Sequence, residues 1–590
     1  MKLLCNPLNI EYKYQFCQNA DGHLSVNREA ADPSLVLFHG TYFLYPSMTL
    51  GFWWSNDLAD WHYHATPNLP TYDYAPDVRV VGDWLYFCAS SHEHGVHYRT
   101  KDPFSDTYEK IEGTFPFWDP NLFEDEDGRV YFYWGSSPRE PIYGIELDPE
   151  TMQPLCERVP LFANNEDVMG FERRGEDHVP ARSAAEKQAI LANLETQEID
   201  PLRKQMAIDY IMDHGYIEGA WMTKHDGIYY LQYGAAGAQF NIYGDGVYVS
   251  RSPLGPFAPA KNNPFSYKPG GFLPGAGHGS TLTDREGTGW HISTMRISIN
   301  HVFERRLGLW PTTWDADGEM ACNQRYGDWP YTLEQFRKDP WAEPQWMLLS
   351  YGKTVTASSE TEDCPVKNAI DENVRSWWKA ATNKPGEWLC LDLGNVFDVR
   401  AVQINLADDQ PDVSLPDGTK LTGDIYDSRW IDPISQPVRW ILEGSLDGET
   451  WSVIKDNSNS ERDLSHDFVD LSEGRQLRYL KLTMLSVPYG QKPCISGLRV
   501  FGLGKCDLPE KAIPASHHWD GDLDAYLSWE GNALGYVVCF GYAPNKLYHS
   551  YMTFEKNVHL GGLIKGQELY IRIDSFNEAG ITHGDVWKCD

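Results

Sequence analysis

Short aromatic-rich runs with a period of two recur from the N-terminus to about Tyr331. In Tyr131-Phe132-Tyr133-Trp134, successive side chains would point to opposite faces, as in a strand with one face against another sheet. Glycines such as Gly40, Gly82 and Gly128 separate these runs and can adopt the positive φ that hairpin turns need. The pattern predicts mostly β-structure.

One unit of this pattern occurs five times. An acidic or small polar residue precedes a strand, a short turn and an aromatic-rich strand. The copies are ADPSLVLFHGTYFLYPS from Ala31, APDVRVVGDWLYFCASS from Ala75, WDPNLFEDEDGRVYFYWGSS from Trp118, IEGAWMTKHDGIYYLQYGAAG from Ile217 and GHGSTLTDREGTGWHISTM from Gly277. With the intervening segments (for example SNDLADW at Ser55 and TKDPF at Thr100), each repeat supplies about four strands, the size of a propeller blade. The sequence predicts an all-β fold that begins with a five-bladed β-propeller.

One segment departs from the repeat. Residues 164–215 contain ARSAAEKQAILANLETQEIDPLRKQMAIDYIMDHG, which is charged, poor in Gly and helix-periodic. We expect a helical insertion there, within a catalytic unit of residues 1–345.

The start of each repeat carries a candidate functional residue. Because the innermost strands of a propeller begin beside its central channel, we expect Asp32, Asp77, Asp119, Glu218 and His278 to converge. Like charges crowded in a partly desolvated funnel are costly unless they are used. Hydrolysis of a glycosidic bond needs one carboxylic acid and one carboxylate, and a third acid can hold the donor's pKa up. Asp77 is expected to be structural.

The motifs ADPS, WDPN and IEGAW, in this order on repeated blades, resemble the family 43 glycoside hydrolases, inverting β-propeller enzymes, over roughly Asn6 to Tyr331. The resemblance implies that Asp32 is the general base, Asp119 the pKa modulator and Glu218 the general acid. It also implies an aromatic face for the sugar at Tyr74. The other residues that it implies are His278, beside a structural calcium ion that is usually reached through water, and Arg296, for a sugar hydroxyl, with Arg305 and Arg306 as competitors.

The C-terminal third has a different pattern. Residues 346–505 resemble a discoidin (factor V/VIII C-type) jelly-roll β-sandwich, in which the loop at Asp371 often binds calcium, although Glu372 stands where Gly is usual. Trp377 and Trp378 are candidates for glycan contact or for core packing. Residues 506–590 resemble a small fibronectin type III-like sandwich with Trp529 in its core, and we expect a spacer role.

Charge and composition exclude several partners. The net charge of -34 disfavours nucleic acid and anionic membranes. No apolar run approaches the ~20 residues of a membrane span. Eleven cysteines, an odd number without a C-x-x-C pair, indicate neither a zinc ribbon nor a dense disulfide framework. The substrate logic favours a secreted or periplasmic location, although Met1 to Ile10 contains no apolar region of signal-peptide length.

The resemblance implies an inverting glycoside hydrolase that releases arabinofuranose or xylose from plant polysaccharides or oligosaccharides. In that case the two key carboxyls stand roughly 6.5–9.5 Å apart. The insertion at residues 164–215, beside the axis, favours exo action because it could close the pocket. The alternatives are a galactofuranosidase or galactanase of the same fold, a non-catalytic glycan-binding protein, and an adhesin in which residues 349–590 do the binding.

Overall fold

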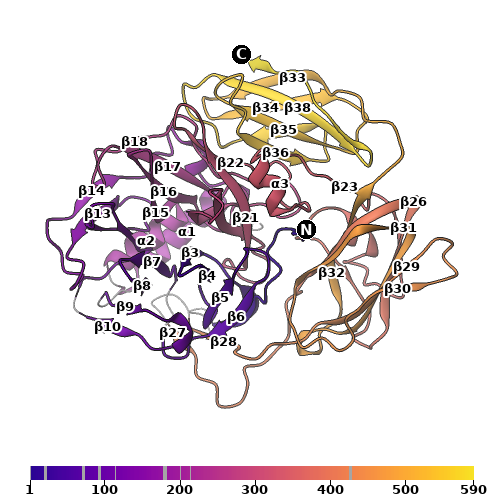
Figure 1. The fold of residues 1–590 in the computed structure, drawn as a ribbon, viewed down its shortest axis with the longest axis horizontal. Coiled ribbons are helices and arrows are strands. Elements are labelled where there is room, and N and C mark those ends of the chain that lie inside the picture. The colour runs from indigo at the N-terminus through magenta and orange to yellow at the C-terminus, as the bar shows by residue number, and fades with distance from the viewer. Residues whose placement is uncertain are drawn as a thin grey trace.

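A computed structural model describes residues 2–18, 23–69, 74–90, 95–112, 114–176, 182–199, 201–212, 214–423 and 428–590. The chain forms three units that follow one another in sequence, indigo to magenta, orange, and yellow in Figure 1. Nearly all regular structure is β-sheet, so the prediction of an all-β fold with few helices is confirmed.

Five four-stranded antiparallel sheets make up most of the first unit. In each sheet the strands are paired in sequence order, as expected for successive hairpins. They are β3 (Ser34–Phe38), β4 (Thr41–Tyr45), β5 (Gly51–Ser55) and β6 (His62–Ala65); β7 (Asp77–Val81), β8 (Trp84–Cys88), β9 (His97–Thr100) and β10 (Glu109–Ile111); β11 (Asn121–Glu124), β12 (Val130–Trp134), β13 (Ile142–Leu147) and β14 (Val159–Phe162); β15 (Tyr216–His225), β16 (Ile228–Ala236), β17 (Gly244–Ser250) and β18 (Ala258–Pro259); β19 (Gly277–Thr283), β20 (Gly289–Arg296), β21 (Arg305–Trp314) and β22 (Met320–Cys322).

The first strands of these sheets close into a ring, because β3 contacts β7, β7 contacts β11, β11 contacts β15, β15 contacts β19, and β19 contacts β3. A recurring hydrogen bond joins neighbours. In four sheets a polar side chain near the start of the first strand accepts from a backbone N–H of the next sheet's first strand. The pairs, acceptor first, are Ser34 and Val78, Asp77 and Leu122, Asn121 and Met222, and Ser280 and Leu35. The last pair joins the fifth sheet to the first.

The expected helical segment contains two helices, α1 (Ala184–Glu195) and α2 (Pro201–Ile211), after a single 3-10 turn, η2 (Gly170–Glu172). Ser183 begins α1 with a capping box, in which its hydroxyl accepts from the N–H of Glu186 and its own N–H donates to the Glu186 carboxylate. Asp209 in α2 is bound by Arg139, whose Nε lies 2.7 Å from Asp209 Oδ1. This ion pair ties the insertion to the loop after β12.

The second unit is an eight-stranded sheet assembly around one apolar core. Its elements are β23 (Met347–Leu348), β24 (Thr354–Ala357), η3 (Val366–Ile370), β25 (Trp378–Lys379), β26 (Glu387–Leu406), β29 (Arg439–Ser445), β30 (Ser452–Asp456), β31 (His466–Ser486), η4 (Pro488–Gly490) and β32 (Cys494–Leu503). Trp378 is fully buried and its indole N–H donates to Ser359 O, so it is a core residue and not a loop ligand. Trp377 is half-buried.

Glu372 has a structural reason to replace the expected Gly. It adopts φ +58, the left-handed region that favours Gly, and it is buried. Its carboxylate pairs with Arg499, which also donates to Asp328 of the first unit. Glu372 therefore contributes to the contact between the first two units. The buried ion pair with Arg499 helps to hold the residue in its strained backbone conformation.

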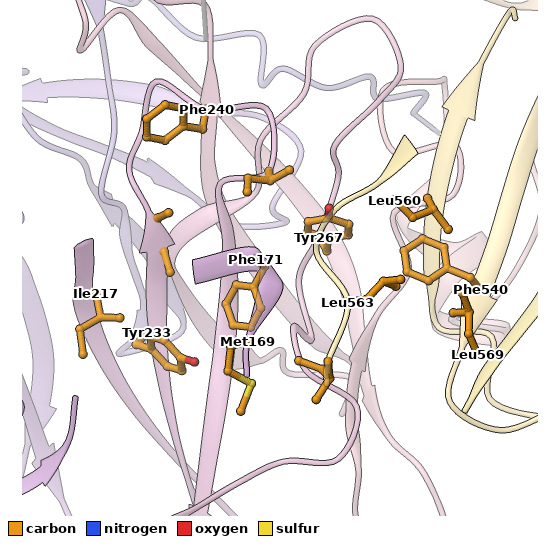
Figure 2. Close-up of a cluster of buried hydrophobic side chains, with 14 of the residues drawn as sticks. Met169, Phe171, Ile217, Tyr233, Phe240, Tyr267, Phe540, Leu560, Leu563 and Leu569 are labelled. Atoms are coloured by element: carbon orange, nitrogen blue, oxygen red, sulfur yellow. The ribbon is translucent and has the colours of Figure 1, made fainter. Parts of the chain in front are cut away.

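The third unit has two facing sheets, one of β33 (Ile513–Asp520), β34 (Asp524–Glu530) and β37 (Asn557–Leu560), the other of β35 (Gly535–Gly541), β36 (His549–Thr553), β38 (Leu569–Asn577), β39 (Gly580–Thr582) and β40 (Trp587–Cys589). Trp529 is buried between them, as expected. The unit packs against the first unit, and the spacer role stays a prediction. Figure 2 shows its Phe540, Leu560 and Leu563 near Phe171 and Tyr267 of the first unit, within one continuous apolar cluster.

The remaining elements are two short helical segments and the strands of one further sheet. The short helix α3 (Leu333–Lys338) follows the fifth sheet, and a 3-10 turn, η1 (Pro103–Ser105), lies in the second. An N-terminal hairpin of β1 (Lys13–Gln18) and β2 (Leu24–Glu29) pairs with β28 (Ser428–Ile431) and, through it, β27 (Thr422–Gly423) from the second unit. All eleven cysteines are free thiols, and no helix among the described residues is long and apolar enough to cross a membrane.

Candidate active site

The five first strands share an unusual backbone conformation, which lies just before the strand or near its beginning. In four sheets, the residue two positions before the acceptor of the hydrogen bond between sheets has a positive φ. In the fourth sheet, which has no such acceptor, the residue at the equivalent position also has a positive φ. These residues are Asp32 (+47°), Ala75 (+53°), Asp119 (+50°), Gly219 (+62°) and His278 (+48°). Positive φ is uncommon for residues other than Gly, and it recurs where a site demands a particular direction of the side chain. The fold therefore sets Asp32, Asp119 and His278 in equivalent places.

Two of the expected positions differ from this frame. Asp77 lies two residues later than Asp32 and Asp119, so it does not share their geometry as the repeat suggested. Its carboxylate accepts from Asn121 Nδ2 at 2.9 Å and from Leu122 N at 2.6 Å in the next sheet. Asp77 therefore belongs to the ring contacts between sheets. Glu218 lies one residue before the equivalent position, which Gly219 occupies.

Asp32 is buried and held from three sides. Ser47 Oγ donates to Asp32 Oδ2 at 2.7 Å, and Arg305 Nη1 donates to Asp32 Oδ1 at 2.9 Å. Its backbone N–H donates to Thr294 Oγ1 of the fifth sheet. The carboxylate thus has a fixed orientation and a cationic partner.

Asp119 lies beside the residue that follows Glu218. Its Oδ2 accepts from Gly219 N at 3.3 Å, and Ser90 Oγ donates to its Oδ1 at 3.3 Å. Burial raises the pKa of Asp119 to about 7, and the negative charges of Glu218 and Asp32 act in the same direction against the opposing effect of His278. The three carboxyl groups are therefore electrostatically linked.

Glu218 is the most exposed of the three carboxyl groups. It is half-buried, whereas Asp32 and Asp119 are each 4% exposed. Tyr243 OH donates to Glu218 Oε1 at 2.6 Å, and Ser136 Oγ donates to Oε2 at 3.2 Å. A substrate that enters from solvent can reach Glu218 more readily than Asp119.

His278 bridges the two buried acids. Its Nδ1 lies 3.4 Å from Asp32 Oδ1 and 3.8 Å from Asp119 Oδ2. Burial lowers its pKa, but Asp32, Asp119, Glu218 and Asp245 together raise it above the ordinary value. Among the described residues there is no group of three or more His, Cys, Asp or Glu that could hold a metal ion. His278 Nδ1 is directed at the carboxylates of Asp32 and Asp119, and the structural calcium ion beside His278 stays a prediction.

The two expected sugar-binding residues lie in different surroundings. Tyr74 is buried, and its hydroxyl has no hydrogen-bond partner among the described residues. The guanidinium groups of Arg305 and Arg429 lie 5.5 Å and 4.7 Å from the centre of its ring. Arg296 is also buried and donates to Gln239 O and Glu176 Oε1. Of the three candidate arginines, Arg305 is the one bonded to Asp32.

Arg306 points away from the carboxyl cluster. Its guanidinium donates to His466 Nε2 of the second unit and to Arg28 O. The competition among the three arginines is thereby resolved for contact with the general-base candidate, whereas direct sugar contact by Arg296 stays a prediction.

The sequence analysis did not identify several residues that hold the site in place. Ser47, Ser90 and Thr294 each accept from the backbone N–H at the positive-φ position of the next sheet, namely Ala75, Asp119 and Asp32. A signal for them was present, because the corresponding repeats end in YPS, CASS and HISTM. Tyr243 had no such signal, since it lies in the loop before β17 outside the repeated motif.

Taken together, a ring of sheets brings two buried acids and one half-exposed acid into a single linked group. A proton donor and a carboxylate that can activate water are what acid–base hydrolysis of a glycosidic bond requires. The fold and site therefore define a candidate glycoside hydrolase.

Comparison with known proteins supports a glycoside hydrolase. The family model described as glycosyl hydrolases family 43 matches residues 25–175 and 180–320. A β-D-galactofuranosidase of Aspergillus niger is 24% identical over 309 residues, covering 46% of this chain and 74% of that protein. A xylosidase/arabinosidase 43A of Humicola insolens is 26% identical over 284 residues, covering 40% and 80%. A β-xylosidase of Xylanibacter ruminicola is 26% identical over 159 residues, covering 27% and 44%. Residues 25–320 belong to glycosyl hydrolases family 43, and the chain is a glycosidase.

Proposed function

We propose that the five sheets are the blades of a five-bladed β-propeller and that this enzyme hydrolyses a glycosidic bond with inversion at the anomeric carbon. The observation that carries the proposal is the linkage of Asp32, Asp119 and Glu218 through His278 Nδ1 and Gly219 N. Binding a neutral sugar does not need three acids in a desolvated place, and this disfavours a purely glycan-binding role.

In the proposed reaction, Asp32 is the general base and Glu218 the general acid. Asp32 takes a proton from water while the water oxygen forms a bond to the anomeric carbon. The bond from that carbon to the leaving oxygen breaks, and Glu218 gives its proton to the leaving oxygen. The reaction leaves Asp32 protonated and Glu218 ionised, and exchange with solvent restores both.

Asp119 is proposed to modulate the donor. It is buried, and its negative form repels that of Glu218, so the pair favours keeping one proton. The more exposed Glu218 is the member that can deliver this proton to a substrate.

The proposed substrate is an oligosaccharide or polysaccharide from which arabinofuranose or xylose is released in an exo manner. The names of the Humicola and Xylanibacter relatives support this choice. A galactofuranosidase is the second candidate, supported by the name of the Aspergillus relative. A secreted or periplasmic location, the structural calcium and the discoidin and fibronectin III-like assignments of residues 346–505 and 506–590 stay predictions.

The experiment is proton NMR of the first-formed product, with nitrophenyl α-L-arabinofuranoside, β-D-xyloside and β-D-galactofuranoside as substrates. Inversion predicts that the first anomer has the opposite configuration to the substrate. Retention would contradict the assignment of Asp32 as a base. Absence of turnover on these substrates and on plant polysaccharides would contradict the proposed hydrolytic activity.

A further inference from the structure

A strand of the second unit lies against the site in the first. β28 lies outside the eight-stranded sheet and pairs antiparallel with β1, with Gln15 opposite Ile431 and Cys17 opposite Arg429. In Figure 1 its label lies among the N-terminal strands, away from β26 and β31. The second unit therefore contributes residues to the neighbourhood of Tyr74 and Asp32.

A continuous chain of side-chain hydrogen bonds runs from this strand to Asp32. Arg429 Nη1 donates to Gln15 Oε1 at 3.0 Å, and Gln15 Nε2 donates to Glu29 Oε2 at 2.8 Å. Arg305 Nε donates to Glu29 Oε1 at 2.9 Å, and Arg305 Nη1 donates to Asp32 Oδ1 at 2.9 Å.

Burial makes each link matter. All five residues are 4% exposed or less, so water cannot replace a lost partner. Glu29 uses one carboxylate oxygen for Gln15 and the other for Arg305, and Arg305 divides its donors between Glu29 and Asp32. A change at Arg429 therefore reaches Asp32 through partners that have no alternative solvent contact.

A second contact runs in parallel. The Arg429 guanidinium lies 4.7 Å from the centre of the Tyr74 ring, and that of Arg305 lies 5.5 Å from it. Ile431 packs in the same small apolar cluster as Tyr74. The strand thus supports both the carboxylate and the aromatic residue expected to face the sugar.

We propose that Arg429 of the second unit is a positioning residue for Asp32, acting through Gln15, Glu29 and Arg305, so that the active site is complete only with β28 in place. The proposal rests on the proposed function of Asp32 as general base. The other ionisable groups that face Asp32 are His278, Asp119 and Tyr243, and all of them lie outside the relay.

The test is Arg429→Met in the full chain, which keeps much of the side chain's apolar length and removes its donors. We expect kcat to fall about tenfold or more and KM to change by a smaller factor, because the hydrogen bonds lead to the proposed base, while the Tyr74 ring keeps Arg305 beside it. The shape of the pH–rate profile should also change, because a displaced Arg305 alters the charge that lies beside the proposed base. Arg429→Lys, which keeps a charged donor, should recover part of both effects.

The matched control is Ser435→Ala. Ser435 lies in the same segment and donates to Glu11 Oε2 of the first unit, but it is outside the relay. It should leave the pH profile unchanged. Gln15→Met interrupts the next link, and the double variant Gln15→Met with Arg429→Met should be no worse than the poorer single variant.

Unchanged kcat and pH profile in a folded Arg429→Met would overturn the relay, as would independent, multiplying effects in the double variant. If Arg429→Met does not fold, the comparison of Arg429→Lys with Gln15→Met carries the same test. Loss of the relay is distinguishable from failure of the proposed function, because in the latter case the wild-type protein itself has no turnover.

Discussion

The first and second sheets have the same backbone conformation just before their first strands, but the side chains there differ. Asp32 and Ala75 have φ values of +47° and +53°, and each lies two residues before the first residue of its strand, β3 or β7. Asp32 faces Arg305 and His278, whereas Ala75 has no side chain that can act on a substrate. The ring of sheets thus provides equivalent places, and the residue at each place decides whether it is catalytic.

The acid of the second sheet shows the other side of this comparison. Asp77 lies two residues further along, where its carboxylate closes hydrogen bonds between sheets. A shift of two residues relative to the repeat therefore separates a carboxylate that joins two sheets from the carboxylate that we propose as the general base.

The largest effect is expected from Asp32→Asn. The amide keeps the shape and can still accept from Ser47 or Arg305, but it cannot take a proton from water. We expect kcat to fall by about 10²–10⁴-fold with folding intact, as judged by initial rates and circular dichroism. A wild-type rate would show that Asp32 is not the base.

The next largest is expected from Gly219→Ala. A Cβ at this position would lie 2.5 Å from His278 Cγ, in addition to the strain of φ +62°. Displacing His278 disturbs its contacts with both Asp32 and Asp119, so we expect kcat to fall about tenfold or more. Gly227→Ala is the control, because φ is +73° there and nothing lies within 4 Å of the added Cβ. Equal activities of the two variants would contradict the assigned contact.

Asp77→Asn is expected to affect stability and not chemistry. Asp77 accepts from two donors, and an amide can accept from only one of them through its oxygen, while its NH₂ would face the other. We expect a loss of about 1–3 kcal/mol in the free energy of unfolding, measured by urea titration. The kcat should stay within about twofold of wild type. A large loss of kcat in the folded variant would return Asp77 to the catalytic group.

Much of this organisation could be predicted from the sequence. The five copies of the repeat correspond to the five sheets, and ADPS, WDPN and IEGAW point to the three acids that the fold brings together. The registers of Asp77 and Glu218 could not be predicted, because a repeat aligned by residue type does not reveal which residue adopts positive φ.

Contacts between the units could not be predicted from the sequence either. The pairing of β28 with β1 joins residues more than four hundred positions apart, and Arg429 has no motif around it. Glu372 could be recognised as unusual, but its partner Arg499 was visible only in the folded chain. Such contacts depend on tertiary packing, which local patterns do not encode.

The smallest expected effect separates Asp119 from Asp77 by the pH dependence of stability. Burial raises the pKa of Asp119 to about 7 and that of Asp77 to about 6, from an ordinary value of 3.8. Folding therefore takes up protons above pH 3.8, and the free energy of unfolding falls as the pH rises through each folded pKa. Between about pH 6 and 7.5 the contribution comes mainly from Asp119, with His278 acting in the same direction because its pKa is raised.

Asp119→Asn removes this titration and also weakens the contribution of His278, which loses a neighbouring negative charge. We expect the melting temperature of Asp119→Asn to fall less than that of the wild type between pH 6 and 7.5, in scanning calorimetry at constant ionic strength. Asp77→Asn should flatten the dependence only below about pH 6. If Asp119→Asn retains the wild-type slope between pH 6 and 7.5, the raised pKa assigned to Asp119 is wrong, because a carboxyl that is ionised throughout this range contributes no pH dependence to the stability.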